Sequence, residues 1–274
     1  MKFLRCKIIP VFVLLGMLFG VLACEEAVDW EFQAGSNDVL VVEAILTDEF
    51  VQQEIQLSLS FDTLNGIPTP VPDAEVWVEA NDISYRFLPD LESPGRYRSE
   101  FPFAVLDDLL YALKVERKGQ LFTATTELSV VAPLPAITFL PYENTDSLRI
   151  PNFAPIYNAN QQAMYELNVD WSHLVGEDSA RAKLLYFTFS TINTGSLIRP
   201  AVDTLAFPKG SIVVAKKFGL NPDFADYLRA MALETQWRGS VFYGPAANLP
   251  TNLDGGALGF FSACAVLVDT LVAQ

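Results

Sequence analysis

A cysteine near the amino terminus is the residue of this sequence whose chemistry is most readily predicted. Cys24 directly follows an apolar run of 16 residues, Ile8–Ala23, and basic side chains precede that run. A basic segment followed by an apolar one is typical of a secretory signal peptide. A membrane span needs roughly 20 helical residues, and Glu25 and Glu26 follow where a stop-transfer segment would be basic. We therefore predict a signal peptide over residues 1–23.

The residues around this cysteine also resemble a known processing signal. Val21-Leu22-Ala23-Cys24 is similar to the lipobox of bacterial lipoproteins, whose cysteine is acylated on sulfur and becomes residue one. The resemblance implies lipidation of Cys24 and a lasting anchor, since each buried CH₂ contributes about 0.8 kcal/mol. An ordinary signal peptide with a chance cysteine is the alternative. Glu25 and Glu26 resemble the acidic export signal of Bacteroidota surface lipoproteins, and the simpler interpretation is an acidic tether over residues 24–38.

Residues that could perform catalysis are scarce. His173 is the only histidine, which excludes a histidine-rich metal site and a two-histidine metalloprotease motif. No Gly-x-Ser-x-Gly, Gly-x-Gly-x-x-Gly or P-loop pattern occurs, so we expect His173 to be a surface or structurally hydrogen-bonded residue. A carboxylate pair for glycoside hydrolysis stays an alternative, because 33 acidic residues do not restrict which of them are close in space. We predict a protein that is not an enzyme and has no catalytic residue and no cofactor.

Two acidic pairs offer oxygen ligands of the kind that calcium prefers. These are Asp107-Asp108 and Glu177-Asp178, and neither matches an EF-hand loop. We interpret both as solvated acidic turns and predict no metal site.

The charge balance restricts the class of partner. Loss of Lys2, Arg5 and Lys7 with the signal peptide would remove three positive charges and no acid, which changes the formal net charge from −15 to −18. Such a chain repels nucleic acid, so we exclude a nucleic-acid partner. Cys264 would then be the one cysteine that is neither removed nor acylated, and its small apolar neighbours predict a buried, inert thiol.

Short β-type runs separated by turn residues fill residues 39–132. In Glu54–Phe61 the apolar residues occupy every second position, which places them on one face of a strand. Lys118-Gly119 predicts a hairpin. Seven such runs predict a β-sandwich of the immunoglobulin-like or carboxypeptidase-regulatory-like kind, without the Cys…Trp…Cys framework of antibody domains. The predicted strands are Val39–Leu46, Glu54–Phe61, Glu75–Ala80, Ser84–Leu88, Arg96–Glu100, Leu110–Arg117 and Leu121–Leu128.

A proline-rich step at Pro133 and Pro135 predicts a boundary before a second β-rich domain over residues 136–274. One helix is predicted there, near residues 222–237, with Asn221 as its amino-terminal cap. An apolar strand is predicted from Leu258 to Leu271, with a bulge or close backbone approach at Gly259. The other predicted strands are Ile137–Leu140, Ala163–Trp171, Leu184–Ile192, Ser196–Phe207 and Ser211–Lys216.

An aromatic group follows the predicted helix and is the candidate contact patch of the sequence. Trp237, Phe242 and Tyr243 lie among glycines, and aromatic side chains are favoured anchors of interfaces that also stack on sugars. The alternative is that these rings pack the helix onto the sheet.

Several stretches together resemble one family. The lipobox, the strand Leu40–Thr47 and above all Asn252-Leu253-Asp254-Gly255-Gly256-Ala257-Leu258-Gly259-Phe260-Phe261 are similar to the Bacteroidota lipoprotein family catalogued as domain of unknown function 4249. The resemblance implies a lipid-anchored outer-membrane or cell-surface protein that assists a TonB-dependent nutrient-uptake transporter. A glycan- or matrix-binding surface adhesin is the alternative, and a hydrolase is disfavoured.

Overall fold

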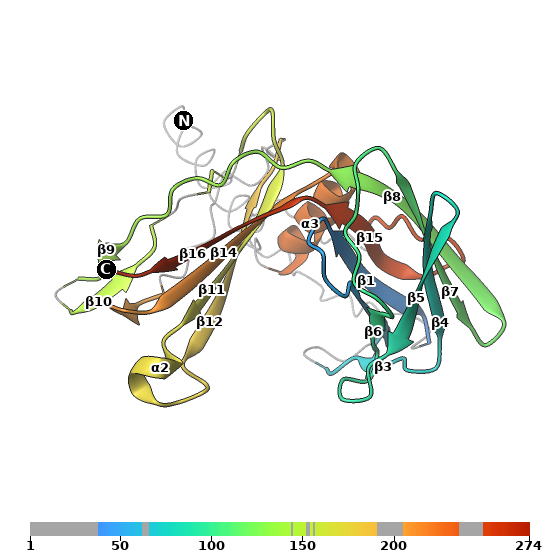
Figure 1. The fold of residues 1–274 in the computed structure, drawn as a ribbon, viewed down its shortest axis with the longest axis horizontal. Helices are drawn as coiled ribbons and strands as arrows, with labels where there is room; N and C mark the ends of the chain where they lie inside the picture. Colours follow the sequence, from blue (N-terminus) through green and yellow to red (C-terminus); the bar gives the residue numbers. More distant parts are fainter. Residues whose placement is uncertain are drawn as a thin grey trace, which may run out of the picture. The chain divides into compact units, whose positions relative to one another are not determined.

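The computed structural model describes residues 38–61, 66–143, 145–151, 154–155, 157–190, 205–235 and 249–274, and Ser36–Gln274 form one compact unit. The protein is mostly β, as predicted (Figure 1). No helix in these ranges is long and apolar enough to cross a membrane.

The largest sheet closes on itself. Its hydrogen-bonded order is β1-β15-β8-β7-β4-β5-β6-β2, and a further pairing of β1 with β2 completes a barrel-like ring. The short strand β3 (Thr69–Pro70) flanks β2. The ring consists of β1 (Leu40–Thr47), β2 (Glu54–Leu59), β4 (Glu75–Ala80), β5 (Ile83–Pro89), β6 (Arg96–Ser99), β7 (Leu110–Arg117), β8 (Gln120–Ser129) and β15 (Leu258–Cys264).

All seven strands predicted between residues 39 and 132 are present. Their period of two directs alternate apolar side chains into one interior, where residues such as Val42, Leu57, Val78 and Leu113 are fully buried. The Lys118-Gly119 hairpin is confirmed, because β7 and β8 pair up to Arg117 opposite Gln120.

The immunoglobulin-like sandwich is not confirmed. Its seven strands join one sheet and do not form two separate layers, because β1 pairs with β2 on one edge and with β15 on the other. β15 pairs in turn with β8 in parallel, and this links the first and last of the seven strands. The missing connection comes from the distant carboxy-terminal part of the chain, which local patterns in residues 39–132 could not indicate.

The predicted strand Leu258–Leu271 is two strands that belong to different sheets. β15 ends at Cys264 in the closed sheet, and β16 (Val266–Val272) pairs with β14 in a second sheet. At Ala265, between them, the N–H donates to Ser129 O over 2.9 Å, while the carbonyl accepts from Gly219 N over 3.0 Å. The apolar run in the sequence continues through Ala265, so it did not indicate this change of sheet.

The second sheet has four antiparallel strands in the order β12-β11-β14-β16 (Figure 1). A smaller sheet has the order β13-β10-β9. Of the predicted strands, Ala163–Trp171 is nearly as expected, Ile137–Leu140 is wrong except at its last residue, and residues 196–204 of Ser196–Phe207 lie outside the described ranges. The observed elements are β9 (Leu140–Pro141), β10 (Ser147–Arg149), β11 (Ala163–Asp170), α2 (Ser172–Val175), β12 (Arg181–Thr188), β13 (Phe207–Pro208) and β14 (Ile212–Gly219).

The predicted helix is present as α3 (Pro222–Thr235). The Asn221 side chain accepts from the N–H of Phe224 over 2.7 Å, which caps the helix as predicted. Phe224 and Tyr227 stack near Phe260 of β15, with ring centroids 5.0 and 5.3 Å away. The apolar stripe of the helix therefore packs on the closing strand.

The proline-rich step follows β8, which is the last of the seven strands predicted between residues 39 and 132. The ammonium of Lys217, a residue only 2% exposed, donates to Pro133 O over 2.9 Å. It also lies 5.4 Å from the centre of the Tyr165 ring, so a cation–π contact adds to the hydrogen bond. This contact fixes the step on β14. A division into two domains at this point stays a prediction. β15 follows the proline-rich step in the sequence but belongs to the closed sheet, whose other strands precede the step.

Gly259 makes the close backbone approach that the sequence predicted. Its φ is +96°, and a Cβ atom added there would be 2.0 Å from the carbonyl oxygen of Val42 on β1. Only glycine fits, because both the backbone conformation and the space exclude a side chain.

We expect Gly259→Ala to lower the free energy of unfolding by about 3 kcal/mol or more, because a backbone clash adds to the conformational cost. Gly256→Ala is the matched control, since Gly256 has a φ of +83° but nothing within 4 Å of an added Cβ. The control should cost about 1 kcal/mol. Urea unfolding measures both values, and equal losses would contradict the packing of β15 on β1.

Candidate functional site

The predicted site residues lie outside the described part of the chain. These are Cys24, Glu25 and Glu26 at the amino terminus and Trp237, Phe242 and Tyr243 after the helix. Lipidation, export and the aromatic contact patch therefore stay predictions. The described residues on either side of the aromatic segment are α3 and the stretch from Leu249 onward.

The most distinctive motif of the sequence, residues 252–261, has a structural role. The Asn252 amide accepts from Phe261 N over 3.0 Å and donates to Phe261 O over 2.8 Å. Asp254 N donates to Thr123 O over 2.8 Å, and the Gln120 side chain donates to Gly255 O over 2.7 Å. These bonds hold β15 beside β8. The motif therefore seats the closing strand, and a ligand site has to be sought elsewhere.

The single histidine and the lone buried thiol also have structural surroundings. His173 Nε2 is 3.2 Å from the Gly210 carbonyl oxygen, which agrees with a structurally hydrogen-bonded histidine. Cys264 is fully buried, and burial raises the pKa of its thiol to about 12. The thiolate fraction at neutral pH is accordingly negligible, so this cysteine is inert as predicted.

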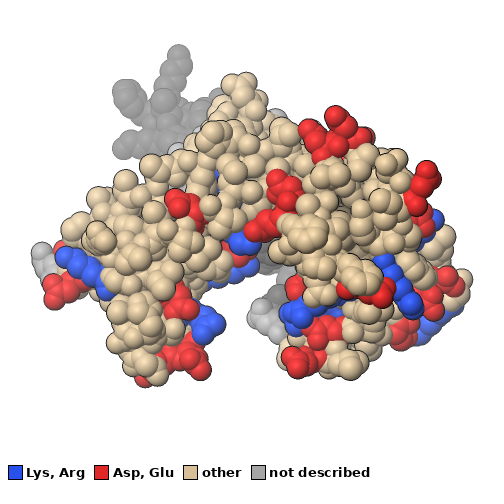
Figure 2. All heavy atoms as spheres, viewed as in Figure 1, with Lys and Arg blue, Asp and Glu red and all other residues tan. Residues whose placement is uncertain are grey.

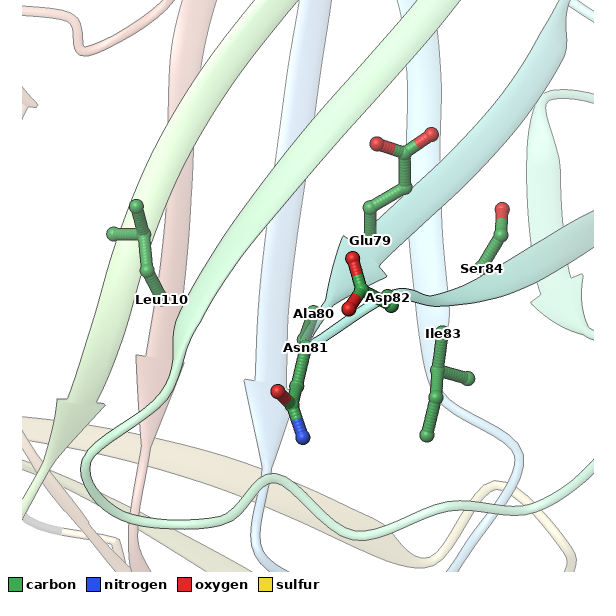
Figure 3. A pocket seen from close by; sticks show the side chains of 7 residues that line it. All are labelled: Glu79, Ala80, Asn81, Asp82, Ile83, Ser84 and Leu110. Carbon is green, nitrogen blue, oxygen red and sulfur yellow. The ribbon is translucent and has the colours of Figure 1, made fainter.

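A shallow hollow of about 350 Å³ lies at the hairpin between β4 and β5. It is lined by Glu79, Ala80, Asn81, Asp82, Ile83, Ser84 and Leu110. The side chains of Glu79 and Asn81 point in opposite directions (Figure 3). The Glu79 carboxylate is 2.7 Å from the Lys114 ammonium. Because its polar groups do not converge on one point, this hollow is a poor candidate for a ligand site.

Clusters of three or more metal-ligating side chains do not occur among the residues that the structure describes. Both acidic pairs considered from the sequence are exposed. In the first pair, the Asp107 carboxylate accepts from Asp108 N over 3.0 Å.

The strongest candidate surface is one side of the four-stranded sheet. Residues paired across neighbouring strands share a face, and here four such rows run across β12, β11, β14 and β16. The first row, Phe187, Met164, Phe218 and Val266, is buried in the cluster that contains the α3 side chains. The other three rows form what we term the open face: Leu185, Glu166, Lys216, Val268; Lys183, Asn168, Val214, Thr270; and Arg181, Asp170, Ile212, Val272.

Aliphatic side chains occupy much of the open face. Leu185 is 43%, Ile212 38%, Val268 47% and Val272 54% exposed. Figure 2 shows acidic side chains spread over the visible surface, basic ones between them and wide uncharged areas. Ile212 and Val272 are paired neighbours, and Val268 lies on the same strand as Val272, whereas Leu185 lies on the opposite edge strand. Exposed aliphatic residues that lie together on a sheet are typical of a surface that another macromolecule covers.

An ion-pair group fixes the charges of this face. The Glu166 carboxylate is 2.6 Å from Lys183 Nζ and accepts from the Asn168 amide over 2.8 Å. Burial raises the pKa of Glu166, and these two hydrogen bonds outweigh that effect, so its pKa is lowered overall. Lys216 lies 3.1 Å from Glu49 of the loop after β1. The face contains three basic and two acidic side chains, in contrast with the acidic chain as a whole.

Sequence reasoning missed this face. On β11 and β14 every second residue is buried on one side of the sheet. The residues between them are polar or aliphatic and less buried, except at Met164 and Phe218. Alternate residues of the strands predicted in this region would have identified the part of the open face that β11 and β14 contribute. The pairing of β16 with β14, which completes it, depends on the hidden break at Ala265.

Comparison with known proteins assigns the chain to a family. A family model described as domain of unknown function (DUF4249) matches residues 25–269. The protein belongs to this family, as the resemblance in residues 252–261 had indicated. No curated protein matches the chain.

Proposed function

We propose that this protein is a non-enzymatic, lipid-anchored accessory of an outer-membrane transporter of the TonB-dependent class, and that it binds its partner through the open face. The single observation that supports this most strongly is the exposed aliphatic surface of the four-stranded sheet. Leu185, Ile212, Val268 and Val272 are between 38 and 54% exposed there, and exposed apolar surface is a feature of protein interaction sites.

A protein partner fits this surface better than a small molecule does. Small ligands bind in concave sites that enclose most of their surface, whereas the open face is one side of a regular sheet. The Glu166–Lys183 ion pair lies beside Leu185 on this face. Apolar contact area with a few oriented charges is the usual composition of a protein interface.

The anchor at Cys24 supplies the second part of the proposal. Acyl chains in the membrane hold the protein beside an integral partner, and this raises the effective concentration of the open face near that partner. A modest interface then suffices for stable association. The acidic residues Glu25 and Glu26 would begin the tether that connects the anchor to the folded unit.

Changing the anchor cysteine should change where the protein is found. We expect Cys24→Ala to move the protein from the membrane fraction to a non-sedimenting fraction or to leave an uncleaved precursor, because the acylation site is lost. Cys6→Ala, within the signal peptide, is the matched control and should leave fractionation unchanged. Mass spectrometry of the amino-terminal peptide should show diacylglycerol on Cys24. An unmodified peptide with the protein free of the membrane would contradict the anchor.

A charge placed on the open face should release the transporter. We expect Leu185→Asp and Ile212→Asp each to reduce recovery of a stoichiometric outer-membrane β-barrel protein at least tenfold in co-purification from native membranes, since both aliphatic side chains would be covered in the complex. Leu121→Asp is the control, because Leu121 on β8 is 54% exposed and lies outside the open face.

The same experiment distinguishes the alternatives. Recovery of the transporter that is equal for all three variants would contradict the role of the open face. Absence of any barrel partner, combined with tight binding of the isolated protein to glycans, would support the adhesin alternative and overturn the transporter proposal.

A further inference from the structure

The edge of the four-stranded sheet formed by β16 is open among the described residues. In the chain from residue 265 to 273, Gly219 N donates to Ala265 O, Gly210 N donates to Ala273 O, and Ala273 N donates to Ser211 O. Odd-numbered residues of β16 therefore face β14. In an antiparallel pair the residues between them direct their N–H and C=O groups to the opposite side, so even-numbered residues form the outer edge.

One residue of this outer edge is already capped. Val266 N donates to the carboxylate of Asp48 over 2.8 Å, which confirms the outward direction of even-numbered residues and shows how the chain closes the edge near the closed sheet. The backbone groups of the next three even residues, Val268, Thr270 and Val272, have no hydrogen-bond partner in the described part of the structure. All three residues are exposed.

This edge has few of the features that normally prevent pairing with another chain, and Asp269 is its one charged side chain. Sheet edges are usually protected by Lys, Pro, bulges or a covering segment. The opposite edge of the same sheet, β12, has Arg181 and Lys183 exposed, whereas β16 has no basic residue and no proline in Val266–Val272. Its sequence, VLVDTLV, is strongly β-forming.

We propose that β16 pairs with β16 of a second copy of this chain, antiparallel and about a two-fold axis at Thr270. In this register Val268 lies opposite the partner's Val272, and Thr270 lies opposite the partner's Thr270. The three residues that point outward on each strand form hydrogen-bonded pairs, and these would satisfy the open N–H and C=O groups of both edges.

Side chains on both faces agree with this register. Valine meets valine and threonine meets threonine on the open-face side, which are favourable cross-strand pairs. On the other side Asp269 lies opposite the partner's Leu271, so the two carboxylates do not meet directly. An isologous contact of this kind joins two four-stranded sheets into one continuous sheet and places the two open faces side by side.

The inference does not depend on the membrane anchor or on a transporter. A single strand pair buries less than a standard interface of roughly 1,600 Å², so the association should be concentration-dependent. Leu185, which tests the proposed function, lies on β12 at the opposite edge of the sheet, so each idea can fail separately.

Cysteine substitution in the full chain tests the register. Hydrogen-bonded antiparallel residues have Cα atoms about 5.5 Å apart, within disulfide range. Under mild oxidation in membranes we expect Thr270→Cys to yield a covalent dimer. In the same register the two Val268 positions of a dimer are four residues apart along the strands, which is about 13 Å at 3.3 Å per residue. Val268→Cys should therefore yield at least tenfold less covalent dimer than Thr270→Cys. The unsubstituted chain is the control, because it shows how much cross-linking the native cysteines give.

A second variant tests the association itself. Thr270→Lys places two ammonium groups opposite each other across the axis, and we expect the dimer dissociation constant in sedimentation or native mass spectrometry to rise at least about tenfold. Leu185→Lys, on the same face but on the opposite edge strand β12, should leave it unchanged. A chain that is monomeric at all concentrations, equal cross-linking of the two cysteine variants, or a dimer that tolerates Thr270→Lys would overturn the proposal.

Discussion

The fold depends on one stretch of backbone that belongs to two sheets. Residues 258–264 complete the closed sheet and residues 266–272 continue as an edge of the four-stranded sheet, with Ala265 between them. Three backbone groups are fixed at this crossing: Ala265 N by Ser129 O, Ala265 O by Gly219 N, and Val266 N by the Asp48 carboxylate. Each comes from a different part of the chain, so the crossing couples β1, β8 and β14 in one place.

Packing around the crossing extends this coupling to the helix. Phe260 and Cys264 of β15 lie in one buried cluster with Phe224 of α3 and with Phe187 and Phe218 of the four-stranded sheet. Burial of each large apolar side chain contributes roughly 1.5–3 kcal/mol, and all of these contributions require β15 in its place. The open face exists because this cluster covers only the first of the four rows on that side of the sheet.

The local parts of this structure could be predicted from the sequence, and the long-range parts could not. Alternation in Glu54–Phe61, the hairpin at Lys118-Gly119 and the cap at Asn221 each depend on neighbours within a few residues, and all three are observed. The closure of the sheet by β15 depends on a parallel pairing of Val41 with Leu258, more than 200 residues apart. No local pattern encodes such a pairing, although Gly259 indicated a close approach without naming Val42 as its partner. For the same reason the open face was missed, and the residues predicted for function lie beyond the described ranges.

Native-state hydrogen exchange over a urea series tests the coupling of the two sheets most directly. Ala265 and Gly219 report the crossing, and Ala273 reports the far end of β16, because each N–H donates to a backbone carbonyl. If one strand ties the sheets together, these amides should exchange with the same free energy as the core amides of the closed sheet. Exchange of the Gly219 and Ala273 amides at a clearly lower free energy, while Ala265 stays protected, would show that the four-stranded sheet opens alone and would contradict the account.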